Sequence, residues 1–148
     1  RCLCVGKSIE IAKYVFRDND QSEYLEDENF LPPEIEKNVI EQTQVICRSM
    51  GYEMNSVEFF IDSDGTPWAI DFNNPIPDGR LEALGQMWYE RYQNQMIQLV
   101  VNAAMEPTTP DFIPDVNIYA QISREDISRK ERFKKASELA KKYYNISN

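Results

Sequence analysis

Two acids and an amide within one short segment are the residues of this sequence best suited to chemistry. Glu58 lies in the run SVEFFI, and Asp71 and Asn73 follow in the run WAIDFNN. Mg²⁺ prefers oxygen ligands in octahedral geometry, usually one or two protein carboxylates with phosphate oxygens and water completing the shell. These three side chains are therefore a candidate magnesium site.

The pattern around these residues predicts a β-hairpin. Two runs rich in β-branched and aromatic residues flank the turn sequence DSDG at 62–65. A turn centred between Ser63 and Gly65 pairs Ile61 with Trp68 and places Glu58 directly opposite Asp71, with about 5 Å between their β-carbons. The same DSDG does not match an EF-hand, because its glycine is the fourth loop position rather than the sixth.

Strand alternation separates the acids from the apolar side chains of the hairpin. The residues expected on the apolar faces of the two strands are Val57, Phe59 and Ile61, and Trp68, Ile70 and Phe72. Glu58 then points to the opposite face, as do Asp71 and Asn73. Two opposed carboxylates destabilise a sheet unless something offsets their charge, and a divalent cation does so directly. An exposed hairpin whose acids merely face water is the alternative.

Composition excludes several kinds of chemistry. The 148 residues contain no histidine, which removes Ser-His triads, Cys-His pairs and the common zinc sites. The three cysteines, Cys2, Cys4 and Cys47, have no CxxC spacing and favour a reducing cytoplasm. No apolar run approaches the roughly 20 residues of a membrane span, and no signal-peptide pattern follows Arg1, so we expect a soluble fragment of a longer protein.

Charge is distributed unevenly. The net charge is -9, but residues 124–148 carry eight Lys/Arg and four acids, so the rest carries 8 − 21 = −13. Such an acidic body is unlike a nucleic-acid binder, which needs clustered positive charge. The basic last segment is interpreted as a solvated helix face, with an anionic partner site or a partner-docking helix as the alternatives.

The elements that must position the candidate site are predicted from periodicity and from helix and turn signals. We expect a hairpin over 1–16 around Gly6-Lys7, a surface loop over 18–29, helices over 33–50 and 81–104, and a last helix capped by Ser128 and Glu131. Pro107, Pro110 and Pro114 should break the chain before that last helix. The predicted fold class is α+β, a mostly antiparallel sheet of two hairpins covered by helices, with residues 1–104 as the domain and 105–148 as linker and helical extension.

With these residues in place, the chain resembles the C-terminal half of an ATP-grasp ligase. In that family, as in D-alanine–D-alanine ligase, a strand bearing an acid, a DG-type turn and a strand ending Glu-x-Asn supply the magnesium ligands. Glu58, Asp71 and Asn73 occupy those places, and the run NNPIPDG resembles the Asn-x-x-Pro-Gly loop beside the substrate. GYEMNSVEF and WAIDFNNPIPD are most similar to bacterial ATP-grasp proteins of unsettled substrate, loosely similar to glutathione synthetase.

The resemblance, which covers roughly residues 1 to 104, implies roles for two cations. RCLCVG is similar to the family strand Arg-x-Phe-Val-Val-Gly, which makes Arg1 the catalytic residue that contacts the ATP phosphates; a frayed terminus is the other interpretation. Lys13 is expected as a second ATP-binding cation or as a solvated strand end. Two departures matter: Ser56 replaces a substrate-binding arginine of D-alanine ligase, and Asp71 replaces the usual glutamate with a shorter reach.

The function that the resemblance implies is an ATP-dependent ligase that joins a carboxylate to an amine or thiol through an acyl phosphate. Its cofactors are ATP and Mg²⁺, and its substrates are small-molecule or peptide carboxylates and amines. The N-terminal half of the same protein is the expected partner that completes the nucleotide site, and a homo-oligomer is possible. The alternative is a degenerate, non-catalytic module that uses the sheet for protein association.

Overall fold

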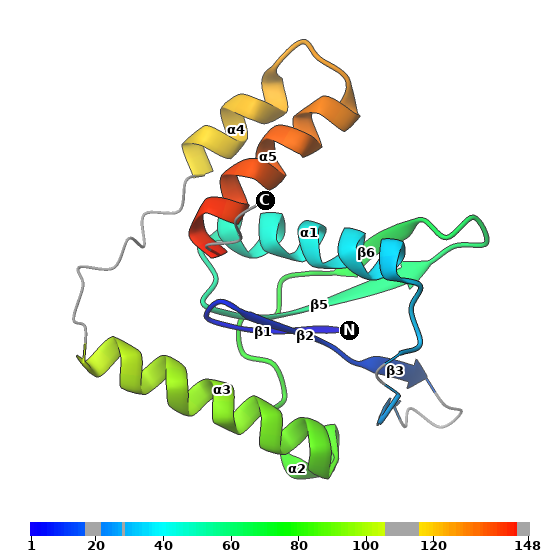
Figure 1. Ribbon diagram of the computed structural model, residues 1–148, viewed down its shortest axis with the longest axis vertical. Helices are drawn as coiled ribbons and strands as arrows, with labels where there is room; N and C mark the ends of the chain where they lie inside the picture. The colour runs from blue at the N-terminus through cyan, green and yellow to red at the C-terminus, as the bar shows by residue number, and fades with distance from the viewer. Residues whose placement is uncertain (17–21, 28, 106–115, 145–148) are drawn as a thin grey trace.

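The computed structural model describes residues 1–16, 22–27, 29–105 and 116–144. It is an α+β fold with a four-stranded antiparallel sheet in the order β2-β1-β5-β6 and a separate two-stranded ribbon, β3-β4 (Figure 1). The strands are β1 (Cys2–Val5), β2 (Ser8–Ile11), β3 (Lys13–Phe16), β4 (Ser22–Leu25), β5 (Met54–Ile61) and β6 (Pro67–Asp71). The helices are α1 (Pro33–Met50), α2 (Leu81–Leu84), α3 (Gln86–Met105), α4 (Val116–Arg124) and α5 (Arg129–Tyr144). The fold class predicted from the sequence is confirmed.

The sheet is buried on both faces at its central strand β1. Alternation along β1 divides its side chains, so that Leu3 and Val5 pack with α2 and α3, while Cys2 and Cys4 pack with α1. Figure 1 shows the same arrangement, with α1 on one side of the sheet and α2 and α3 on the other. The molecule therefore has two small apolar cores, one on each face.

Helix α1 begins and ends where the sequence predicted. Pro33 occupies its first position, where a missing N–H costs nothing, and Gly51 ends it with a positive φ of 71°. The Gly51 N–H donates to the Arg48 carbonyl at 3.3 Å, and the Tyr52 N–H to the Cys47 carbonyl at 2.9 Å. These bonds satisfy carbonyls at the end of the helix and aim the chain into β5.

The predicted helix over 81–104 is interrupted at Gly85, whose φ of 73° divides it into α2 and α3. Trp88 and Tyr92 of α3 are buried against the sheet. The Trp88 indole N–H donates to the Leu25 carbonyl at 3.1 Å, which ties α3 to the β3-β4 ribbon. Only the first part of α3 is covered in this way.

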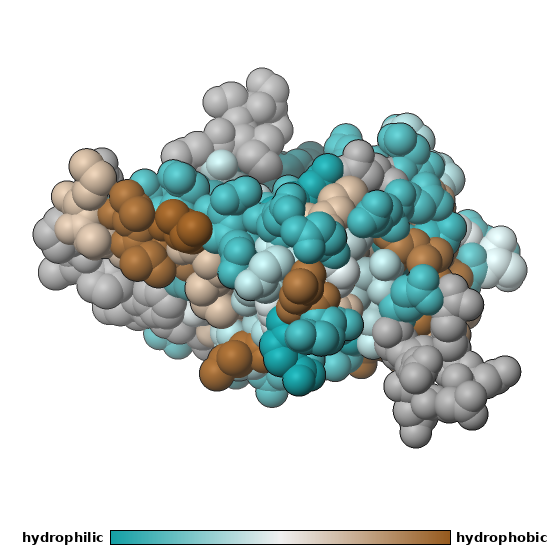
Figure 2. Space-filling view, turned by 90° about the horizontal axis from the view of Figure 1, so that it is seen from below, coloured by the Kyte–Doolittle hydropathy of each residue, from teal (hydrophilic) through white to brown (hydrophobic). Residues whose placement is uncertain are grey.

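The second part of α3 exposes a run of apolar side chains. These are Ile97, Val100, Val101 and Met105. Figure 2, seen from the α3 side, shows hydrophobic residues gathered at the end of the molecule where this part of α3 lies. The apolar side chains of α3 are thus buried near α2 and exposed at the far end of the helix.

The segment over 18–29 is not a loop throughout. The segment predicted as a loop over 18–29 contains strand β4, which antiparallel pairing with β3 stabilises despite its polar composition. Helix α4 was not predicted.

The capping box of α5 is confirmed: the Glu131 N–H donates to Ser128 Oγ at 3.2 Å, and the Ser128 N–H to Glu131 Oε2 at 3.0 Å. The prolines at 107, 110 and 114 lie outside the described residues.

The C-terminal helix packs on α1. Lys141 Nζ pairs with Glu41 Oε1 at 2.8 Å, and the Tyr143 hydroxyl donates to Glu53 at 2.8 Å. Part of the basic surface expected from the sequence is therefore used within the chain. No helix among the residues that the structure describes combines the length and apolarity that a membrane crossing requires.

Candidate functional site

The two acids predicted to face each other do so. Glu58 of β5 and Asp71 of β6 are direct register partners, and directly paired residues of an antiparallel ladder present their side chains on the same face. The route to this pairing differs from the predicted one, because Ile61 is opposite Pro67 rather than Trp68. A β-bulge corrects the register, since Ile70 is an extra residue of β6 between the pairs Phe59–Ala69 and Glu58–Asp71.

The bulge also changes which side chains of β6 reach the core. Ala69 packs in the α1-side core beside Phe59, whereas Trp68, Ile70 and Phe72 are exposed. The expectation that these three share one face with Ile61 is wrong, because Trp68 pairs with Phe60 and the bulge at Ile70 breaks the alternation before Phe72. The acid pair consequently lies next to exposed aromatic and aliphatic side chains.

Register brings Arg1 beside the acids. Because Cys2 is opposite Val57 across β1 and β5, Arg1 is opposite Glu58, and the two side chains form an ion pair. Only 15% of the Arg1 side chain and 13% of the Glu58 side chain are exposed, so the pair is largely removed from water. Arg1, Glu58 and Asp71 therefore form one row across three neighbouring strands.

The β3-β4 ribbon holds the Arg1 guanidinium from its other side. Arg1 Nη1 donates to the Tyr24 hydroxyl at 2.6 Å, and its guanidinium carbon lies 4.0 Å from the centre of the Tyr14 ring, within cation–π distance. Burial raises the pKa of the Tyr24 hydroxyl, which keeps it protonated, although nearby Arg1 opposes this shift. The ribbon thus fixes the direction in which Arg1 points.

Asp71 differs from Glu58 in its surroundings. Its side chain is exposed, and it has no hydrogen-bond or ion-pair partner within residues 1–16, 22–27, 29–105 and 116–144. Across the strand pair, Glu58 already has its cation in Arg1. The row therefore offers one compensated carboxylate and one carboxylate whose charge the described residues leave uncompensated.

The side chain of Asn73 does not join Glu58 and Asp71, contrary to the prediction from the sequence. Its side-chain oxygen accepts a hydrogen bond from the Tyr52 hydroxyl, and Tyr52 packs against the core on the α1 side. The next residue, Asn74, donates from Nδ2 to Ser56 Oγ at 2.9 Å. Ser56 and Glu58 lie on the same face of β5, being two residues apart. The amide on the face of the acids is therefore that of Asn74 rather than Asn73.

A buried asparagine positions this segment. Asn55 is fully buried; its Nδ2 donates to the Phe72 carbonyl at 3.1 Å and its Oδ1 accepts the Asn74 N–H at 3.0 Å. Sequence reasoning missed this role, although a polar residue at an inward position of a strand is a visible signal for it. Tyr14 and Tyr24 gave no comparable signal, because the second of them lies in a segment that resembles a loop.

Lys13 does not join the row. Its ammonium group pairs with Asp27 Oδ2 at 2.9 Å, and the two side chains are 38% and 46% exposed. It lies one residue after Ala12, the backbone partner of Arg1, and so at the same end of the sheet. The predicted ATP-binding role of Lys13 stays a prediction.

The loop after β6 is held close to α3. A β-carbon added to Gly79 would lie 2.5 Å from the Tyr92 ring, so only glycine fits this approach. The next residue, Arg80, forms a bidentate pair with Asp78 at 2.8–2.9 Å, and its guanidinium lowers the pKa of the Asp78 carboxyl to about 2. The segment 73–79, which resembles the family's substrate-side loop, is therefore held in place at its C-terminal end.

Comparison with protein-family models, with curated proteins and with solved structures yields no significant match for this chain. The family resemblance therefore depends on the motif residues alone.

The residues present fit a magnesium ion that is shared with a ligand better than a metal held by protein alone. No cluster of three or more acids or cysteines suited to a metal exists among the described residues. Two directly opposed carboxylates, one of them exposed and without a partner in the described part of the chain, match the one or two protein ligands that Mg²⁺ usually takes beside phosphate oxygens and water.

Proposed function

We propose that this chain forms the magnesium- and phosphate-binding part of an ATP-dependent ligase that activates a carboxylate as an acyl phosphate for attack by an amine or thiol. The observation that carries the proposal is the row Arg1–Glu58–Asp71, in which a guanidinium and two carboxylates lie side by side on one face of a sheet. A binding site for a phosphate–metal pair needs this combination of cation and acids. The motif resemblance adds support, because it assigns the same three positions.

Each side chain has a definite task in this proposal. Glu58 and Asp71 would hold Mg²⁺, which in such a ligase offsets the negative charge of the phosphates during transfer. Arg1 supplies a planar guanidinium suited to bidentate contact with phosphate oxygens. Tyr14 and Tyr24 keep this guanidinium in place, so that little reorganisation is needed when an anion arrives. Asn55 fixes the backbone that follows Asp71.

The other half of the nucleotide site is proposed to come from the preceding part of the same protein. Lys13, the second cation predicted for this site, pairs with Asp27 instead. We therefore expect this chain by itself to bind Mg-ATP weakly and not to turn it over, because correct positioning of reactants accounts for several kcal/mol of barrier reduction.

The test is calorimetric titration of this chain and of the full-length protein with ATP, each in the presence and absence of magnesium. Binding should require magnesium and should weaken about tenfold or more in Asp71→Asn, since loss of a charged ligand costs at least about 1.4 kcal/mol. Asp64→Asn is the matched control, because it removes the same charge from the exposed turn of the same hairpin. Equal binding by the two variants, or binding without magnesium dependence, would contradict the proposal.

A second candidate function, a non-catalytic module for protein association, has its own support. The hairpin that carries the acids exposes Phe60, Trp68 and Ile70, and α3 exposes a further apolar run. Large exposed apolar patches mark interaction surfaces. If Mg-ATP binding is absent in the full-length protein as well as in this chain, association becomes the better supported function.

A further inference from the structure

The edge strand β2 carries an additional feature on the side of the sheet away from the acid row. β2 is the terminal strand of the sheet, and no described strand pairs with its outer edge. A cavity of about 200 Å³ opens along this edge. It is lined by Ile9, Glu10, Ile11, Phe30, Leu31, Glu36, Ile40, Trp88 and Arg91.

The backbone of β2 is oriented to pair with another strand. Arg1 and Ala12 exchange both backbone hydrogen bonds, each of 2.9 Å, so they form a hydrogen-bonded pair of the β1-β2 ladder. Such pairs alternate along an antiparallel ladder with pairs that make no bond to each other. Ile11 and Ile9 are therefore of the second kind, and their N–H and C=O groups point away from β1 toward the outer edge.

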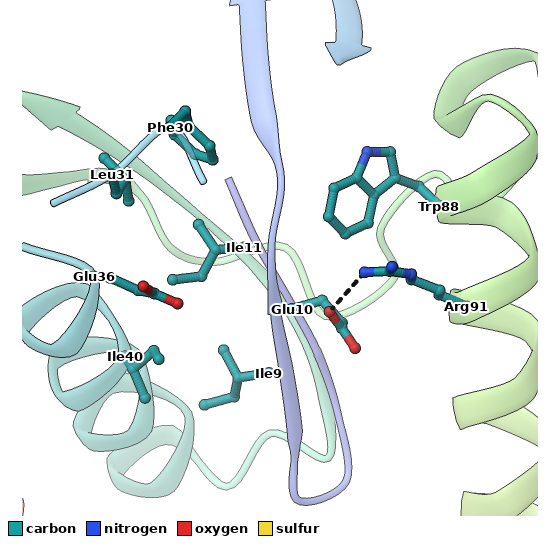
Figure 3. Close-up of a pocket in the computed structure, with 9 residues that line it drawn as sticks. All are labelled: Ile9, Glu10, Ile11, Phe30, Leu31, Glu36, Ile40, Trp88 and Arg91. Carbon is teal, nitrogen blue, oxygen red and sulfur yellow. Dashed lines mark ion pairs between the residues drawn. The ribbon is translucent and has the colours of Figure 1, made fainter. Parts of the chain in front are cut away.

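Side chains on the α1 side of this edge contribute both apolar groups and the carboxylate of Glu36 to the cavity. Figure 3 shows Ile9 and Ile11 directed toward Ile40 and Glu36 of α1, with Phe30 and Leu31 at the far end. The whole cavity, which also reaches Glu10, Trp88 and Arg91, has a volume of about 200 Å³. A cavity of about 150 Å³ is large enough to hold benzene, so this one has room for an aromatic or large aliphatic side chain.

Charge at the rim favours a cation. Glu10 is already compensated, because Arg91 lies 3.6 Å away and Gln95 donates to it at 2.9 Å. Glu36 is exposed on the first turn of α1 and makes no ion pair within the described part of the chain. With this acid lining the cavity beside Ile40, a positively charged group on an incoming strand has a direct partner.

We propose that the outer edge of β2 binds an extended peptide segment as an added strand. The segment places an aromatic or large aliphatic side chain in the cavity and, two residues further along on the same face, a lysine or arginine beside Glu36. Backbone hydrogen bonds to Ile9 and Ile11 give affinity, and the cavity and Glu36 give selectivity, as in other cases of β-strand addition. This site is separate from the acid row and does not depend on the proposed ligase function.

The test measures binding of short capped peptides by fluorescence anisotropy. The probe is fluorescein-labelled Thr-Phe-Thr-Lys-Thr, and its charge-reversed partner is Thr-Phe-Thr-Glu-Thr. We expect the lysine peptide to bind about fivefold more tightly, the upper end of the range for one exposed ion pair. Glu36→Lys should remove or reverse the preference. Glu34→Lys is the matched control, because it makes the same charge change in the same helical turn without lining the cavity.

A second measurement tests strand addition without altering the protein. N-methylation of alternate peptide amides removes either the donors that face β2 or those that face solvent. One methylation pattern should abolish binding and the other should preserve it. Tolerance of both patterns, equal binding of the two peptides, equal effects of Glu36→Lys and Glu34→Lys, or no binding at millimolar peptide would each overturn the proposal. Sedimentation completes the test, since a dimer that the peptide dissociates would show that a second copy occupies this edge.

Discussion

Neutralising the two acids of the row should change the stability of the magnesium-free protein in opposite directions. Asp71→Asn removes a carboxylate that faces Glu58 and has no partner among the described residues, so it should stabilise the fold by about 0.2–1 kcal/mol, the usual size of a cross-strand pair. Glu58→Gln removes the charged partner of Arg1 where the two side chains are 15% and 13% exposed. Loss of a charge-assisted hydrogen bond there should cost about 1.5–3 kcal/mol.

These free energies convert into measurable shifts. For a protein of 148 residues, the entropy of unfolding is about 0.31 kcal/mol/K, taking about 2.1 cal/mol/K per residue. Glu58→Gln should therefore lower the midpoint of thermal unfolding by about 5–10 °C, and Asp71→Asn should raise it by about 1–3 °C. Arg1 keeps its contacts with Tyr14 and Tyr24 in both variants, which is why the cost stays below that of a fully buried charge.

The assay is thermal unfolding followed by circular dichroism, without magnesium and then with it. Added Mg²⁺ at ten times its Kd should stabilise the wild type by about 1.4 kcal/mol, and Asp71→Asn should lose most of this gain. Asp64→Asn serves as the charge control. A clear loss of stability in Asp71→Asn would mean that this carboxylate accepts structural hydrogen bonds. A neutral Glu58→Gln would mean that the Arg1–Glu58 pair contributes nothing, and either result would refute the reasoning.

Three further predictions concern the surroundings of the row. Asn55→Ala leaves a carbonyl and an N–H of segment 72–74 without partners and should destabilise the protein by about 2–4 kcal/mol in denaturant unfolding; a loss below about 1 kcal/mol would show that other groups replace the amide. Arg80→Gln should return the pKa of Asp78 from about 2 toward its ordinary value, as measured by NMR titration. Because that pKa is depressed in the fold, the small stability linked to it is present above about pH 4 and is lost as the pH falls toward 2. The variant should show a weaker dependence, since the backbone N–H of residue 80 still donates to Asp78. Burial raises the pKa of the Cys2 thiol to about 11, so thiol reagents at neutral pH should label it only as fast as the protein unfolds; rapid labelling of the native protein would contradict its burial.

Much of the candidate site was predictable because hairpins are local. The turn sequence at 62–65 and the alternation of the flanking runs predicted a hairpin with Glu58 opposite Asp71, and the structure has this pair. The predicted partner of Ile61 was nevertheless wrong by one residue. The bulge at Ile70 compensates for that error, and a bulge leaves no distinct mark in strand periodicity.

Contacts between distant segments were harder to predict. The neighbourhood of Arg1 and Glu58 follows from the pairing of β1 with β5, which are separated by a helix and a ribbon along the chain. The tyrosines that hold Arg1 come from a ribbon whose second strand is too polar to be recognised by composition. The side chain of Asn73 turned toward Tyr52 because the chain leaves the strand after Asp71, where alternation no longer applies.

The sequence by itself determined the α+β class, the bounds of α1 and the cap of α5, because each depends on residues close together in the chain. Only the tertiary structure decided that Arg1 compensates Glu58 while Asp71 stays exposed, and that the edge of β2 borders a cavity. These properties depend on which strands become neighbours and which helix covers each face, and burial across the whole chain determines both.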